Sequence, residues 1–161
     1  MINHRKYLKR AVGNALKSGC VRGKRGVVIV KDGRIIVEGY NSVYPTEDHC
    51  RRHGCLRDKL GLQMGQEVEK TRAVHAEALA VAEAAKKGIV LEGAVIYITC
   101  MPCINCAKLI LASGMKEVYY LDLYGDRVGE KFLVQMGAMC KRMRLKGDRI
   151  ETRLRDTGGQ E

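Results

Sequence analysis

The apolar positions of the chain change their period several times, and each change predicts an element. In residues 5–17 they recur every three or four positions, which indicates an amphipathic helix. Residues 27–31 are mostly β-branched, and residues 34–40 alternate apolar with polar side chains, so both segments predict strands. The dipeptide Asp32-Gly33 between them is typical of tight hairpin turns. The chain is therefore expected to begin with a helix and a β-hairpin.

The second half of the chain predicts helices that alternate with strands. The expected elements are a helix at 76–87, a strand at 93–99, a helix at 103–113, a strand at 118–121, a helix at 126–136 and a strand near 138–145. A glycine follows each helical pattern, as is common where helices end. This alternation favours a three-layer α/β sandwich.

Between the two halves, residues 42–72 show no sustained period. They are rich in charged, His and Cys residues, and we expect an irregular insertion with one short helix. A structureless segment of that length is uncommon unless something holds it in place. Residues 147–161 are polar and predict a frayed tail. With 161 residues in total, the chain is expected to form a single domain, 1–161.

Composition narrows the class of protein. Apolar residues make up 46% of the chain, which fits a globular protein. Apolar runs stay short, whereas a membrane-spanning helix needs about 20 such residues, so no membrane span is expected. No secretory signal follows the basic N-terminus, so we expect a cytoplasmic protein, with a mitochondrial transit peptide as an alternative for the acid-free start. Seven cysteines in such a chain indicate metal binding or catalysis rather than disulfides.

One His, one Glu and two Cys residues form the most specific chemical pattern. His75 and Glu77 stand at the start of one predicted helix, and Cys103 and Cys106 stand at the start of the next. A spacing of three places both sulfurs on one helix face, and a helix N-terminus lowers the pKa of a thiol. One His and two thiolates provide three ligands for tetrahedral zinc and leave a fourth position for water, as in catalytic sites. Glu77 is then the candidate proton carrier.

His75-x-Glu77 followed by Pro102-Cys103-x-x-Cys106 is the signature of zinc-dependent nucleobase deaminases. The chain resembles this superfamily over residues 5–145, and within it most of all the deoxycytidylate (dCMP) deaminases and their competence-operon relatives. The residues that carry the resemblance are Gly39-Tyr40-Asn41, His49-Cys50, Gly54-Cys55, Arg72 to Glu77, Pro102 to Lys108, Tyr120, Asp122, Tyr124 and Asp126. The resemblance implies a cytidine-deaminase-like α/β/α sandwich around a mixed five-stranded sheet.

The resemblance also implies an activity, the hydrolytic deamination of dCMP to dUMP with release of ammonia. The implied ligands of a catalytic zinc ion (Zn²⁺) are His75, Cys103 and Cys106. Glu77 would pass a proton from the attacking water to N3 of the base and then to the leaving ammonia. The backbone N–H of Ala76 would hold the base carbonyl. Asn41 would bond the substrate sugar or base, although it could equally be a turn residue that closes the hairpin.

Relatives of this kind are often homohexamers, and some are regulated by dCTP and dTTP. We therefore expect a homo-oligomer, with both nucleotides as possible effectors. Two departures from the family pattern bear on this expectation. Leu79 stands where the family usually has Asn near the zinc helix, and Ser42 replaces a common Gly in a loop linked to substrate and effector binding. The second change leaves regulation by dCTP and dTTP open.

His49, Cys50, His53 and Cys55 form a second cluster, within the insertion. Some dCMP deaminases hold a second, structural zinc ion there, and the family often adds a His-Cys pair just before the catalytic His. This chain has Glu69-Lys70 at that place. The expected second site is therefore His49, Cys50 and Cys55, completed by Glu69 or by Cys20, and the alternative is a set of free loop side chains. Cys100 and Cys140 receive no role.

The formal net charge of +11 indicates an anionic partner, and a nucleotide phosphate is one. Relatives carry a basic residue just before the first strand, so Arg22 is the expected phosphate-binding residue; the alternative is a solvated basic face. Two other functions stay open. The charge also suits a deaminase acting on a base in tRNA or single-stranded DNA. Leu79 alone supports a catalytically silent zinc-binding or nucleotide-binding module, and the intact Glu77 opposes it.

Overall fold

The structure is a computed structural model that describes residues 3–125 and 127–145. In chain order its elements are α1 (His4–Ala15), β1 (Gly26–Lys31), β2 (Arg34–Tyr40), β3 (Ser42–Val43), α2 (His49–His53), α3 (Leu56–Lys59), β4 (Ala73–Val74), α4 (Ala76–Lys86), β5 (Val95–Cys100), α5 (Ile104–Ala112), β6 (Glu117–Asp122), α6 (Val128–Gln135) and β7 (Met139–Arg142). The predicted tail at 147–161 and Asp126 lie outside the described residues.

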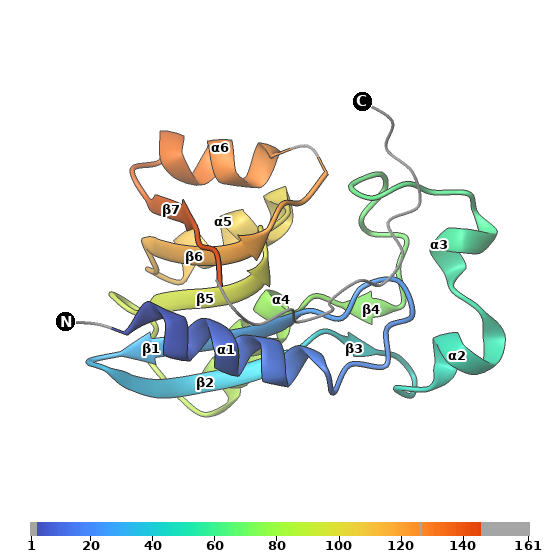
Figure 1. Cartoon of the computed structure of the whole chain (residues 1–161), viewed down its shortest axis with the longest axis horizontal. Coiled ribbons are helices and arrows are strands. Elements are labelled where there is room, and N and C mark those ends of the chain that lie inside the picture. Colours follow the sequence, from blue (N-terminus) through green and yellow to red (C-terminus); the bar gives the residue numbers. More distant parts are fainter. Residues whose placement is uncertain (1–2, 126, 146–161) are drawn as a thin grey trace.

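A mixed five-stranded sheet in the order β2-β1-β5-β6-β7 forms the centre of the molecule (Figure 1). Strand β1 pairs antiparallel with β2 and β5, whereas β5, β6 and β7 run parallel. The parallel strands end at the same edge of the sheet, and the connection from β5 to α5 leaves from that edge. Ligand sites in α/β proteins commonly form at such an edge.

The central strands are buried on both faces, which explains their continuous apolar sequences. On one face Ile29, Ile96 and Ile98 pack with helices α4, α5 and α6. On the other face Val28 and Tyr97 pack under α1, which crosses the sheet in Figure 1. The molecule is therefore the expected three-layer α/β/α sandwich, with one helix on one face and three on the other.

The helices and strands predicted from apolar periodicity are confirmed, with shifts of one to a few residues at their ends. The helix predicted at 103–113 begins at Ile104 because Cys103 is its N-cap. The strand predicted near 138–145 ends at Arg142. Within the part of the chain that the structure describes, no helix is both long and apolar enough to cross a membrane.

The insertion at 42–72 contains more secondary structure than the single short helix predicted. Its ends are joined because β3 pairs antiparallel with β4, with Ser42 opposite Val74. The short helices α2 and α3 follow one another between them, to the right of the sheet in Figure 1. The prediction of one helix was wrong because two single-turn helices around Gly54 are too short to give a periodic signal.

Candidate active site

Two helix N-termini meet at the edge of the sheet and bring the predicted metal ligands together. His75 is the N-cap of α4, and Cys103 is the N-cap of α5. Both residues have extended backbone, and their carbonyls accept the first helical hydrogen bonds, from Leu79 (3.0 Å) and Ala107 (2.9 Å). Cys106 lies one turn further along α5. The sequence positions therefore fix three side chains on two rigid helix starts.

The ligand atoms of His75, Cys103 and Cys106 have the spacing that a tetrahedral zinc ion requires. The Nδ1 atom of His75 lies 3.5 Å from the sulfur of Cys103 and 3.4 Å from that of Cys106. Zinc bonds of about 2.3 Å to sulfur and about 2.1 Å to nitrogen would place those atoms about 3.6 Å apart. Among the described residues, this is the only group of three such side chains with all ligand atoms within 4.8 Å of one another. The residues present therefore fit zinc.

The charges of these groups also suit a divalent cation. Cys106 and His75 lower the pKa of the Cys103 thiol, whereas Cys103 and burial raise the pKa of the Cys106 thiol. A coordinating thiol loses its proton outright, so both sulfurs would be thiolates on a bound zinc ion. The hydrogen bond with Cys103 raises the pKa of His75.

Glu77 is buried beside these ligands and is held by α4. It occupies the first turn of the helix, where a carboxylate interacts favourably with the helix dipole. Its side chain is only 7% exposed, and burial raises its pKa above the usual range for a carboxyl. A carboxyl with a raised pKa can both accept and return a proton near neutral pH, as the predicted role of proton carrier requires.

Ala76 and Asn41 both line the same pocket. The N–H of Ala76 is among the first of α4, which have no acceptor within the helix and remain available for a carbonyl. The amide of Asn41 is already engaged: its Oδ1 accepts from the N–H of Arg25 (2.7 Å) and its Nδ2 donates to the carbonyl of Gly23 (2.9 Å). Asn41 therefore fixes the loop before β1, and its predicted bond to substrate stays a prediction.

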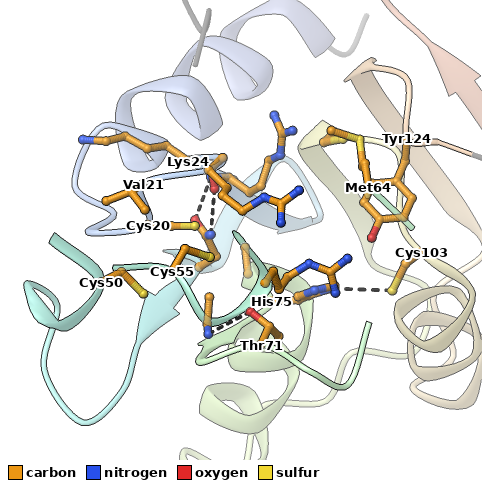
Figure 2. A pocket seen from close by; sticks show the side chains of 18 of the residues that line it. Cys20, Val21, Lys24, Cys50, Cys55, Met64, Thr71, His75, Cys103 and Tyr124 are labelled. Atoms are coloured by element: carbon orange, nitrogen blue, oxygen red, sulfur yellow. Dashed lines mark hydrogen bonds between the residues drawn. The ribbon is translucent and has the colours of Figure 1, made fainter. Parts of the chain in front are cut away.

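The pocket above these groups has a volume of about 1210 Å³ and is lined by cations from several segments. Figure 2 shows its walls. The guanidinium of Arg25, just before β1, lies 3.9 Å from the carboxylate of Asp122, which pairs with Cys100 at the sheet edge. Arg25 also lowers the pKa of Glu77, although burial dominates. Lys and Arg residues outnumber Asp and Glu residues in the pocket lining, so the pocket suits an anionic ligand.

Arg22 lies in this pocket, as predicted, but its guanidinium already has partners. Its Nη2 donates to the carbonyl of Leu62 (2.9 Å), and its Nη1 lies 3.2 Å from the carboxylate of Asp58. That Nη1 is buried and makes no hydrogen bond within the described part of the chain. Arg22 thus joins the loop before β1 to the insertion, and its bond to a phosphate stays a prediction.

The predicted second zinc site is arranged differently from the expectation. Burial and, to a smaller extent, the thiols of Cys55 and Cys20 raise the pKa of Cys50, so the three thiols lie near one another. Figure 2 shows them on one wall of the pocket. The ring of His49 instead faces His53 at 4.7 Å, and Glu69 is exposed. These thiols do not reach the tight spacing of the first site.

Three residues of the site region gave no clear signal in the sequence. Arg57 and Met64 belong to the insertion, which has no periodic pattern, yet both line the pocket. Gly129 is the third, and it lies within α6. A Cβ atom on Gly129 would lie 2.1 Å from the carbonyl oxygen of Pro102, so α6 packs directly on the turn that presents Cys103. An isolated glycine inside a helical pattern was the available signal for such packing.

A sheet-edge pocket, one His, two thiols and a buried carboxyl define a zinc-dependent hydrolytic site. Comparison with known proteins identifies the family to which the chain belongs. Residues 1–122 match the family model described as "Cytidine and deoxycytidylate deaminase zinc-binding region". The chain therefore belongs to the cytidine and deoxycytidylate deaminase family.

Individual relatives agree with the family model. "ComE operon protein 2" of Bacillus subtilis is 35% identical over 132 residues, which cover 81% of this chain and 66% of that protein. The deoxycytidylate deaminase of Mycobacterium phage D29 is 35% identical over 119 residues, covering 71% of this chain and 90% of that protein. The chain spans only 36% of the Schizosaccharomyces pombe deoxycytidylate deaminase, at 30% identity.

A solved structure shows the same fold. The dCMP deaminase from cyanophage S-TIM5 in complex with dCMP and dUMP superposes with a TM-score of 0.69 and 27% identity, covering 89% of this chain and 99% of that one. The expected cytidine-deaminase-like fold is thus confirmed.

Proposed function

We propose that the protein is a zinc-dependent deaminase that converts dCMP and water to dUMP and ammonia. The observation that carries the proposal is the group His75, Cys103 and Cys106 with the zinc spacing, beside the buried Glu77. The basic pocket above it and the named deoxycytidylate deaminases among its relatives support a nucleotide substrate.

The chemistry that a zinc ion supplies at such a site is the acidification of water, to a pKa of about 7. His75, Cys103 and Cys106 would hold the ion. Glu77 would accept a proton from the attacking water and donate it to N3 of the base, and it would then carry a second proton to the amine that leaves C4 as ammonia. The N–H of Ala76 would hold the base carbonyl in place during these transfers.

A substrate panel tests this function. The zinc-loaded protein is incubated with dCMP, deoxycytidine, single-stranded DNA and tRNA, and ammonia release is measured for each. Release from dCMP in preference to the others is expected. Deamination of nucleic acid with a strongly salt-dependent affinity would overturn the proposal in favour of a base-editing enzyme. Bound zinc without ammonia release from any substrate would indicate a binding module.

We further propose that Arg22 binds the 5′-phosphate of the nucleotide. Its Nη1 atom lies 3.2 Å from the carboxylate of Asp58 but makes no hydrogen bond within the part of the chain that the structure describes, so it has a donor to offer a phosphate oxygen. Arg22→Ala is expected to raise KM for dCMP by about 10-fold or more, since hydrogen bonds to charged groups contribute about 1.5–3 kcal/mol. Activity on deoxycytidine should change little. Equal losses on both substrates would contradict phosphate binding and show that Arg22 only supports the insertion.

We also propose a second, structural zinc ion at the thiols of Cys20, Cys50 and Cys55, which metal binding would draw closer together than they lie in this structure. They come from two segments that are far apart in the sequence, and such a clip would hold the insertion to the loop before β1. The wild-type chain is expected to bind two zinc ions, Cys50→Ser one, and Cys103→Ser one. Cys140→Ser, on β7, serves as the matched control and should keep both. A single zinc in the wild type, lost in Cys103→Ser, would contradict the second site.

Assembly as a homo-oligomer and regulation by dCTP and dTTP remain proposals from family resemblance. Ser42, which replaces a family glycine, donates its hydroxyl to the carboxylate of Glu47, and that carboxylate also accepts from the N–H of Gly19 (2.8 Å). The loop linked to effectors in relatives is therefore tied to its neighbours in this chain.

A further inference from the structure

The segment 62–67 of the insertion forms part of the active-site pocket although it has no helix or strand. Met64 and Gly65 line the pocket. A Cβ atom on Gly125 would lie 3.1 Å from the carbonyl oxygen of Met64, and one on Gly65 would lie 3.9 Å from the ring of Tyr124. The segment thus meets the loop after β6, and Figure 2 shows Met64 and Tyr124 on the same side of the pocket.

Apolar contact cannot account for the position of this segment. Met64 is 49% exposed, and its neighbours Gln63 and Gln66 are exposed as well. Fixing the backbone of each residue costs about 1–2 kcal/mol of conformational entropy. Another interaction must therefore hold the segment against the loop after β6.

The guanidinium of Arg57, from α3, supplies that interaction. Its Nη2 donates to the carbonyls of Gln63 and Gln66, both at 2.6 Å, and its Nη1 donates to the carbonyl of Glu67 at 2.8 Å. Charge-assisted hydrogen bonds are about twice as strong as neutral ones, and the planar fork of Arg presents several donors at fixed angles. Arg57 therefore makes three of the hydrogen bonds that hold this turn; Arg22 adds one to the carbonyl of Leu62, and the Oε1 atom of Gln66 accepts one from the N–H of Gln63.

We propose that Arg57 is a positioning residue of the active site, which builds the 62–67 wall before substrate binds. The inference rests on the proposed function, because it takes the pocket to be the nucleotide site. Arg57 would act through the three carbonyls that it bonds, on the turn that brings Met64 and Gly65 to the pocket. A chain without Arg57 would have to order residues 62–67 during binding. Its apparent affinity for nucleotide would then be the intrinsic affinity multiplied by the fraction of molecules in which this segment is already ordered.

Steady-state kinetics on Arg57→Ala tests the proposal. KM for dCMP and for deoxycytidine should both rise by about 10-fold or more, with a smaller change in kcat and unchanged zinc content. Arg57→Lys should restore only part of the loss, because an ammonium cannot bridge three carbonyls as a planar fork does. Arg52→Ala is the control: it removes the same charge from the insertion, where Arg52 is exposed and pairs with Asp48. Arg52→Ala should behave as wild type.

Hydrogen exchange separates this inference from the proposed function. In the zinc-loaded protein without substrate, Arg57→Ala should speed amide exchange within 62–67 and leave α4 and α5 protected. Unchanged exchange in 62–67, or a KM equal to that of wild type, would overturn the positioning role. A wild-type protein that releases no ammonia from dCMP would overturn the proposed function, and the exchange experiment would still decide whether Arg57 orders the wall.

Discussion

Glu77→Gln is expected to lower kcat for dCMP by a factor of about 10²–10⁴, the usual contribution of a positioned general acid–base. The amide has nearly the shape of the carboxyl but cannot take a proton from water or return it to the base. Glu77 is buried at the first turn of α4, so the substitution leaves packing at the site intact. Zinc content and the KM for dCMP should stay close to wild type. Steady-state kinetics and metal analysis on the same preparations check both expectations.

Glu83→Gln is the matched control for this experiment. Glu83 lies on the same helix but is partly exposed, and its carboxylate pairs with Lys87 at 2.9 Å. Its loss should leave kcat unchanged. Turnover by Glu77→Gln within a few-fold of wild type would contradict the assigned role, because no other buried carboxyl among the described residues lies beside the ligands. Loss of zinc in Glu77→Gln would instead show that this carboxyl supports the metal site.

The parts of the site that were predicted from the sequence depend on local geometry. His75, Glu77, Cys103 and Cys106 lie in the first turns of two helices, and the direction of a side chain there follows from helix geometry alone. The apolar periods predicted where α4 and α5 start, and the His-x-Glu and Pro-Cys-x-x-Cys motifs supplied the expectation that the two starts share one site.

The parts that were not predicted depend on contacts between distant segments. The guanidinium of Arg22 bonds the carbonyl of Leu62, and Cys20 packs against the cluster that contains Cys50. No period or spacing in the sequence encodes such contacts, because they depend on how the insertion packs against the rest of the chain. The same reason explains Asn41: its candidate role was visible, but its bonds to Gly23 and Arg25 were not.

Gly129 belongs to both cases. The sequence shows it as an isolated glycine in a helical pattern, but the reason for a glycine there is a contact with the distant residues Pro102 and Cys103. In a helix, Ala is favoured over Gly by about 1 kcal/mol, so Gly129→Ala should stabilise α6 if the helix alone mattered. The new Cβ, however, would lie 2.1 Å from the carbonyl oxygen of Pro102 and 2.9 Å from the carbonyl carbon of Cys103. These are backbone atoms that cannot turn aside, so α6 or the turn that carries Cys103 must shift.

We therefore expect Gly129→Ala to lower the free energy of unfolding by about 1–3 kcal/mol, as overpacking in a core does. Because the displaced turn carries a metal ligand, zinc affinity should fall by about 10–100-fold, as for other residues that support ligands from behind. Denaturant unfolding and competition with a chelator measure the two effects. Gly13→Ala in α1 is the control, since nothing lies within 4 Å of its added Cβ, and it should be neutral or stabilising. Equal free energies of unfolding and equal zinc affinities for the two variants would contradict the prediction. They would show that the turn can shift without loss of stability and that the zinc site does not depend on the close approach of α6.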